Sequence, residues 1–200
     1  LNGFKSFAEK TNFLIEDGLT GIVGPNGCGK SNIVESLRWA MGETSAKSMR
    51  GSGMEDVIFN GTSNKASKNI AEVSILVDNA SHAGPMQYKD IDQIEIKRKI
   101  EKDKGSKFYI NNKEVRARDA QMFFADLSTG AHSPSMISQG RIGALVTAKP
   151  TDRRAILEEA ANISGLHVRR HEAELRLNAA ETNLKRADEL RRQQEKQLAN

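Results

Sequence analysis

The sequence predicts one α/β domain followed by a long polar helix, and three observations support this fold class. Strand-like apolar runs alternate with two amphipathic stretches over the first 150 residues. A glycine-rich segment stands between the first apolar run and the first amphipathic stretch. All ten aromatic residues lie at or before Phe124, and all four prolines at or before Pro150. We therefore expect residues 1–150 to form the domain and residues 151–200 to form the helix.

Four apolar runs predict strands, at residues 19–23, 70–78, 93–100 and 108–111. Turn residues separate these runs, as is typical of strand boundaries. Two stretches between them have helical periodicity, at residues 31–41 and roughly 118–127. The first stretch presents one apolar face and is followed by Gly42, a common helix stop. In the second, Met122, Phe123 and Phe124 are expected to pack in the core.

The polar tail, residues 153–200, has no aromatic residue and no proline, and only Gly165 interrupts its helical composition. Apolar residues recur in it at alternating steps of four and three, which is the spacing of a coiled-coil seam. These residues are Ala173, Leu177, Ala180, Leu184 and Ala187. Arg191 and Gln194 occupy the next two seam positions before Leu198 restores the pattern. The tail is therefore predicted to begin a coiled coil, and a lone helix is the alternative.

Composition restricts the class of protein. The 200 residues carry 30 Lys and Arg against 26 Asp and Glu, and 38% are hydrophobic, which suits one domain with a buried core. No apolar run approaches the roughly 20 residues of a membrane-spanning helix. A single cysteine excludes a disulfide framework, and the N-terminus lacks a signal peptide's apolar stretch. We expect a cytoplasmic protein with no membrane contact and, since the chain begins without Met, part of a longer one.

The glycine-rich segment matches the pattern GxxxxGK[ST] in full. It consists of Gly24, Pro25, Asn26, Gly27, Cys28, Gly29, Lys30 and Ser31. Glycines let consecutive backbone N–H groups turn inward around a polyphosphate, and the following helix adds its positive dipole end. Lys30 would reach the β and γ phosphates, while the Ser31 hydroxyl would ligate Mg²⁺. This segment predicts a nucleoside triphosphate site in which Cys28 serves as a small spacer.

Five strings together resemble the N-terminal half of the ATPase head of bacterial SMC (structural maintenance of chromosomes) proteins. The strings are GFKSFAEKT, GPNGCGKSNIVESLRWAMGE, AKSMRG, MEDVIFNG and MISQGRIG. The resemblance implies a P-loop NTPase fold of the ABC-ATPase type, whose N-terminal lobe has a mixed sheet with helices. The start of a long coiled-coil helix would follow it.

The resemblance also implies roles for single residues. Residues 25–32, including Asn32, would form the Walker A loop that binds ATP. Gln139 in ISQG would be the Q-loop residue that helps to ligate Mg²⁺, and Arg50 would be the R-loop arginine near the phosphates. Lys5 is a weaker candidate for nucleotide contact.

The general-base glutamate and the signature motif of the family are expected in the C-terminal half of the same head. Residues 73–78 imitate an apolar strand ending in a catalytic Asp, but Asn79 follows where the glutamate should stand. Residues 127–130 resemble the signature motif but precede the Q-loop, which is the wrong order. Both segments are interpreted as ordinary structure. The 200 residues alone are therefore expected to lack ATPase activity, which the complete protein would have.

Basic residues gather around the predicted hairpin at Lys97, Lys99, Lys102, Lys104 and Lys107. Such clusters bind DNA phosphates largely without regard to sequence. Acidic residues interleave with them, so a solvated strand face is an equal alternative. The preferred DNA contacts are Arg116 and Arg118, which follow shortly after.

The resemblance implies an ATPase whose heads dimerise on ATP and whose turnover drives DNA clamping, chromosome condensation and segregation in association with the nucleoid. Its partners would be the C-terminal half of the head, a second head in a homodimer, DNA and a kleisin-type subunit. A DNA repair ATPase of the RecF or RecN type is the near alternative. A P-loop small-molecule kinase and a coiled-coil scaffold with a vestigial nucleotide fold are more distant ones.

Overall fold

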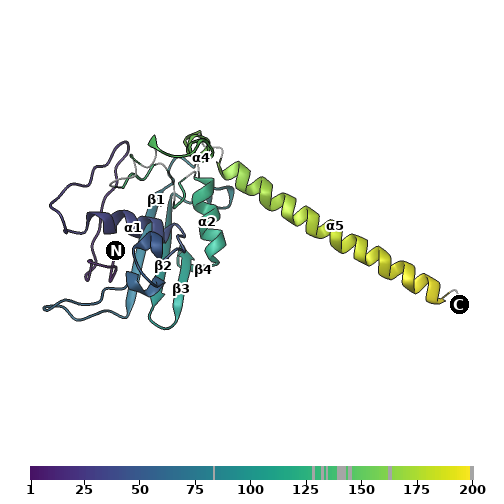
Figure 1. Cartoon of the computed structure of the whole chain (residues 1–200), viewed down its shortest axis with the longest axis horizontal. Helices are drawn as coiled ribbons and strands as arrows, with labels where there is room; N and C mark the ends of the chain where they lie inside the picture. Colours follow the sequence, from purple (N-terminus) through teal and green to yellow (C-terminus); the bar gives the residue numbers. More distant parts are fainter. Residues whose placement is uncertain are drawn as a thin grey trace.

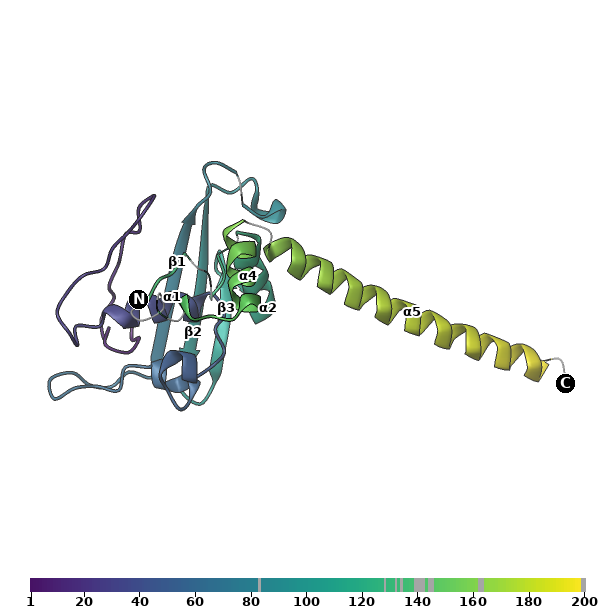
Figure 2. The same ribbon diagram turned by 45° about the horizontal axis from the view of Figure 1, so that its top comes forward.

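The structure is a computed structural model of the chain, and it describes residues 1–198 except 83, 128, 132, 134, 139–142, 144–145 and 162–163. A compact part built around one sheet is followed by a long helix that extends away from it (Figures 1 and 2). No helix in the described part of the chain is both long and apolar enough to cross a membrane.

Four antiparallel strands form the sheet in the order β1-β2-β3-β4. Their bounds are Ile70–Asp78, Gln93–Glu101, Gly105–Ile110 and Lys113–Val115. The predicted strand at 70–78 is confirmed at both ends, and those at 93–100 and 108–111 are confirmed with shifted ends. The fourth strand was not predicted, because three residues are too few to show alternation.

One face of the sheet is apolar. Alternation along β2 points Ile94, Ile96 and Ile100 to this face, where Ile96 pairs with Ile75 of β1 and Ile110 of β3. Helix α1 (Lys30–Ala40) packs there with Trp39 and Ala40, and helix α2 (Ala117–Asp126) packs with Phe123 and Phe124. The helices predicted at 31–41 and 118–127 are thus confirmed within one residue at each end. The opposite face carries mostly polar and charged residues, with Ile70 and Leu76 of β1 also exposed on it.

The predicted strand at residues 19–23 is wrong in this structure. The segment has no strand hydrogen bonds, and the side chains of Leu19 and Val23 are 97% and 92% exposed. An isolated extended segment is unstable without a neighbouring strand to satisfy its backbone groups. The sheet formed by the described residues is therefore antiparallel. The mixed sheet that the family resemblance implies would require residues 19–23 to pair with another strand.

The described residues of the tail form two helices, where one was predicted. Helix α4 spans Pro150–Ala160 and helix α5 spans Ser164–Leu198. Helix α5 projects from the compact part as one long rod (Figure 1). The seam residues Leu177 and Leu184 are 60% and 69% exposed on it, so the predicted apolar stripe is available for a partner helix.

Candidate nucleotide-binding site

The glycine-rich loop connects the extended segment to the N-terminus of α1. Gly27 and Gly29 have φ angles of +81° and +92°, in the left-handed region that favours glycine. A Cβ atom on Gly29 would lie 2.7 Å from Ser6 Oγ, so the loop also needs glycine there for close packing. The loop therefore has the backbone freedom to turn its N–H groups toward a bound anion.

Lys30 and Ser31 are the first two residues of α1. The Lys30 ammonium folds over the loop and donates hydrogen bonds to the carbonyls of Gly24 and Pro25, at 2.7 and 2.5 Å. Within the described residues, no side chain caps the helix end at Gly29. The N-terminal amides and a mobile primary amine thus face the same loop, which is a suitable arrangement for an anion.

The donor set fits a nucleoside triphosphate with Mg²⁺. The loop amides and Lys30 would hold the phosphates, and Ser31 would supply a hydroxyl ligand to the metal, which is a hard cation that prefers oxygen. Cys28 is a free, exposed thiol whose sulfur lies 3.9 Å from Lys30 Nζ. Gln139, the predicted second metal ligand, lies outside the described residues.

Arg50 comes from a separate segment and reaches the same end of α1. It follows the short 3₁₀ turn η1 (Lys47–Met49) and donates from Nη2 to Asn32 Oδ1 at 2.8 Å. Asn32 in turn donates to Ser6 Oγ at 2.9 Å. The structure therefore brings Asn32 and Arg50, two predicted nucleotide-site residues, into direct contact.

Lys5 does not face the loop. Its ammonium pairs with Glu35 Oε2 at 2.5 Å and also donates to the carbonyl of Met49. Glu35 additionally pairs with Arg50 Nε. Sequence reasoning missed Glu35, because six of the eleven residues of α1 are polar or charged and one carboxylate among them does not stand out.

Arg98 secures the other end of α1. It is 4% exposed, and its Nη1 donates to the carbonyls of Trp39 and Glu43, each at 2.7 Å. Its guanidinium stacks 4.5 Å from the Trp39 ring and 4.6 Å from the Phe108 ring. Burial lowers the pKa of Arg98 to about 10, a shift that the nearby Glu43 partly offsets. This residue was also missed, although it occupies an inward position in the alternation of β2.

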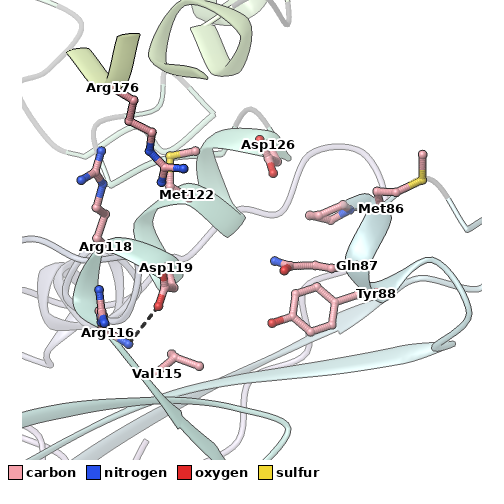
Figure 3. Close-up of a pocket in the computed structure, with 11 residues that line it drawn as sticks. Met86, Gln87, Tyr88, Val115, Arg116, Arg118, Asp119, Met122, Asp126 and Arg176 are labelled. Carbon is pink, nitrogen blue, oxygen red and sulfur yellow. Dashed lines mark hydrogen bonds between the residues drawn. The ribbon is translucent and has the colours of Figure 1, made fainter. Parts of the chain in front are cut away.

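The predicted DNA contacts line a separate cleft of about 530 Å³ between η3 (Met86–Tyr88), the start of α2 and α5. Figure 3 shows Arg118 of α2 and Arg176 of α5 extending toward one another, with Arg116 nearby. Burial, with a contribution from Asp119, raises the pKa of the Tyr88 phenol in this cleft. Arg116 and Arg118 therefore line one cleft together with Asp119 and Asp126, and α5 supplies a third arginine that sequence reasoning did not select.

The lysines of the β2–β3 hairpin have mostly acidic neighbours. Lys104 pairs with Glu101 at 2.6 Å, Lys107 with Glu114 at 3.1 Å, and Lys97 lies 3.5 Å from Glu95. Lys107 has a raised pKa, mainly because it hydrogen-bonds Glu114. This pairing favours a solvated strand face for these residues over a phosphate-binding one.

Comparison with known proteins gives consistent matches over most of the chain. A family model described as the RecF/RecN/SMC N terminal domain matches residues 1–142. The chromosome partition protein Smc of Rhodopseudomonas palustris is 57% identical over 190 residues, and that of Cereibacter sphaeroides is 58% identical over 190 residues. Each match covers 95% of this chain, which spans 16% of the length of these curated relatives.

Solved structures of SMC heads share the fold. The Smc head domain of Pyrococcus furiosus, bound to the C-terminal domain of ScpA, has a TM-score of 0.72 at 31% identity, covering 94% of this chain and 47% of that one. The SMC head domain of Thermotoga maritima has a TM-score of 0.57 at 30% identity, covering 74% of this chain and 49% of that one. The chain therefore belongs to the RecF/RecN/SMC family and corresponds to the N-terminal region of the head of bacterial chromosome partition Smc proteins.

Proposed function

We propose that this chain is the ATP-binding half of an SMC head that dimerises on ATP. The observation that carries the proposal is the glycine loop with Lys30 lying over it at the N-terminus of α1. The loop amides, Lys30 and Arg50 would bind the triphosphate, and Ser31 and Gln139 would hold Mg²⁺. One solved relative was studied for the ATP-driven dimerization and DNA-stimulated activation of SMC ATPases, which supports this function.

Hydrolysis requires the C-terminal half of the same head. Each C-terminal half carries a general-base glutamate, which acts in its own head, and a signature motif, which contacts the nucleotide bound to the other head of the homodimer. The exposed apolar segment of this chain supports the first requirement, because Leu14, Leu19 and Val23 are at least 80% exposed. The 200 residues alone are then inactive, and the complete protein is an ATPase. Relatives at 57% and 58% identity favour this function over a RecF- or RecN-type repair ATPase.

Two further partners complete the proposal. One solved head of this family is bound to the C-winged helix domain of ScpA and another to the C-terminal domain of ScpA, which supports a kleisin-type subunit as partner. DNA binds through Arg116 and Arg118 without sequence preference. The work of the complete protein is DNA clamping, chromosome condensation and segregation at the nucleoid in the cytoplasm.

Substitution of Lys30 tests the nucleotide site. In the full-length protein that contains this chain, we expect Lys30→Ala to weaken binding of a fluorescent ATP analogue in Mg²⁺ about a hundredfold, because a charge-assisted contact to phosphate is lost. Lys10→Ala, which removes an exposed lysine elsewhere, is the matched control. Equal affinity of the wild-type and Lys30→Ala proteins would favour the scaffold alternative.

A salt series tests the DNA contacts. The double variant Arg116→Ala, Arg118→Ala should weaken binding of a random-sequence duplex and reduce the slope of log K against log salt by about 2. The control, Lys104→Ala with Lys107→Ala, removes the same charge from acid-paired lysines. An unchanged slope in the arginine variant would remove these residues from the DNA site.

A further inference from the structure

Glu35 receives two cations from two separate segments of the chain. It lies in α1, little more than one turn beyond Lys30, and its side chain is 8% exposed. Lys5 reaches it from the N-terminal segment and Arg50 from the loop after η1. A buried carboxylate needs such partners, because desolvation without them would be costly. Here one carboxylate serves two cations, so an excess of positive charge remains beside the phosphate loop.

Both cationic residues have unusual backbone conformations. Lys5 has φ +44° and Arg50 has φ +53°, in the left-handed region that residues with side chains seldom adopt. Such conformations persist where surrounding contacts hold them, and they concentrate at functional sites. Backbone hydrogen bonds from Lys5 to the Val57 carbonyl and from Arg50 to the Lys47 carbonyl hold the main chain here. The side chains are held by Glu35, with the Met49 carbonyl as a second acceptor for Lys5.

The guanidinium of Arg50 makes a second contact that ties it to the phosphate loop. Nη2 bonds Asn32, Asn32 bonds Ser6, and Ser6 lies against Gly29 of the loop. The Arg50 side chain is nevertheless 58% exposed. Its position is therefore set from the buried side while its outer edge stays accessible to a ligand.

We propose that Glu35 is a positioning residue that orients Arg50 for nucleotide phosphate. This inference rests on the proposed ATP site. Holding a long, flexible arginine in place before binding avoids much of the ordering cost that binding would otherwise incur. Lys5 is the second anchor of the same carboxylate.

A double-mutant cycle with Arg50 tests the proposal in the full-length protein, with a fluorescent ATP analogue and Mg²⁺ as the probe. If loss of the carboxylate leaves Arg50 oriented in about one molecule in ten, Glu35→Gln weakens binding about tenfold. Arg50→Ala weakens it at least as much. Because Glu35 acts through Arg50, adding Glu35→Gln to Arg50→Ala produces no further loss.

A merely structural role gives a different pattern. Glu35→Gln would then reduce affinity by the same factor with or without Arg50, and additive losses would overturn the proposal. Glu43→Gln is the matched control, because it removes another buried carboxylate, just beyond the far end of α1. It should lower the melting temperature without changing the affinity for the ATP analogue.

Arg50→Lys keeps the test valid if Glu35→Gln does not fold. Lysine retains the charge but lacks the fork that engages Glu35 and Asn32 together. We expect it to weaken binding nearly as much as Arg50→Ala, and wild-type affinity in Arg50→Lys would overturn the proposal. If Lys30→Ala also binds the analogue normally, the proposed ATP site itself is wrong. If Lys30→Ala weakens binding while Arg50→Lys binds like the wild type, only the proposed role of Glu35 is wrong.

Discussion

The two ends of helix α1 differ in how far this chain completes them. At the C-terminal end, Trp39 is fully buried, and Arg98 donates to the carbonyl of Trp39 and to that of Glu43 just beyond the helix. At the N-terminal end, the loop and the segment before it are exposed, with Val23 at 92%. One end of α1 is therefore stabilised by the chain's own sheet, while the other leaves its loop and an apolar segment exposed.

The largest expected effect is at the buried end. Arg98→Ala should destabilise the full-length protein by about 3 kcal/mol, because two carbonyls lose a charged donor and two aromatic rings lose their stacking partner. Chemical denaturation of the head measures it. Lys99→Ala, the partly exposed neighbour on β2, should change the free energy of unfolding by less than about 0.5 kcal/mol. Equal losses in the free energy of unfolding for Arg98→Ala and Lys99→Ala would contradict the stabilising role of Arg98 at the C-terminal end of α1.

A pair of identical substitutions sharpens the contrast between the two ends. Val73→Ala removes two methyl groups from a fully buried site on β1 and should cost about 2 kcal/mol. If the C-terminal half of the head covers the segment at residues 14–23, Val23→Ala should cost nearly as much in the full-length protein. Denaturation curves of the two variants decide this.

The informative result is the one for Val23. A neutral Val23→Ala beside a destabilising Val73→Ala would mean that the segment remains exposed in the complete protein. The strand predicted at residues 19–23 would then be absent from the complete protein as well. The proposal that the C-terminal half of the head covers the segment at residues 14–23 would also fail.

The smallest expected effect concerns the loop that carries Arg50. Asp56 accepts hydrogen bonds from the backbone N–H groups of Ser52 and Gly53 and from the Ser52 hydroxyl. These bonds, that of Gly53 first, hold the pKa of Asp56 below its usual 3.8. The contribution of the Asp56 carboxylate to the free energy of unfolding is therefore fully present above pH 3.8. It is lost as the pH falls through the lower pKa that Asp56 has in the folded protein.

Hydrogen exchange checks this prediction. At pH 6, Asp56→Asn should speed exchange of the Ser52 and Gly53 amides several-fold, because the neutral amide is a weaker acceptor than the carboxylate. Glu55→Gln, in the same loop, should have a smaller effect on these two amides. Unchanged exchange in Asp56→Asn would show that the carboxylate does not order the loop.

Local patterns predicted the parts of the fold whose partners lie in this chain. Strand 70–78 and both core helices follow from periodicity, because alternation or a helical face is buried by neighbouring elements. The segment at 19–23 has the same apolar pattern, but nothing in the described structure pairs with it. Periodicity indicates which segments can be buried, and it does not show whether the covering surface belongs to the same chain.

The candidate site was predicted in the same partial way. The loop from Gly24 to Ser31 is defined by contiguous residues, so a sequence pattern alone can predict it. Glu35 and Arg98 depend on contacts between residues that are far apart in the sequence, and their partners emerge only in the fold. For Arg98 the inward position between Ile96 and Ile100 was a usable signal, because a cation on an apolar face must find acceptors.

The most direct test of the central claim is a structure of the full-length protein with Mg²⁺ and a non-hydrolysable ATP analogue. We predict a triphosphate on the amides of residues 27–31, with the Lys30 ammonium released from the carbonyls of Gly24 and Pro25 and bound to phosphate. A nucleotide bound elsewhere, or a Lys30 that keeps its carbonyl bonds beside an ordered nucleotide, would contradict the account.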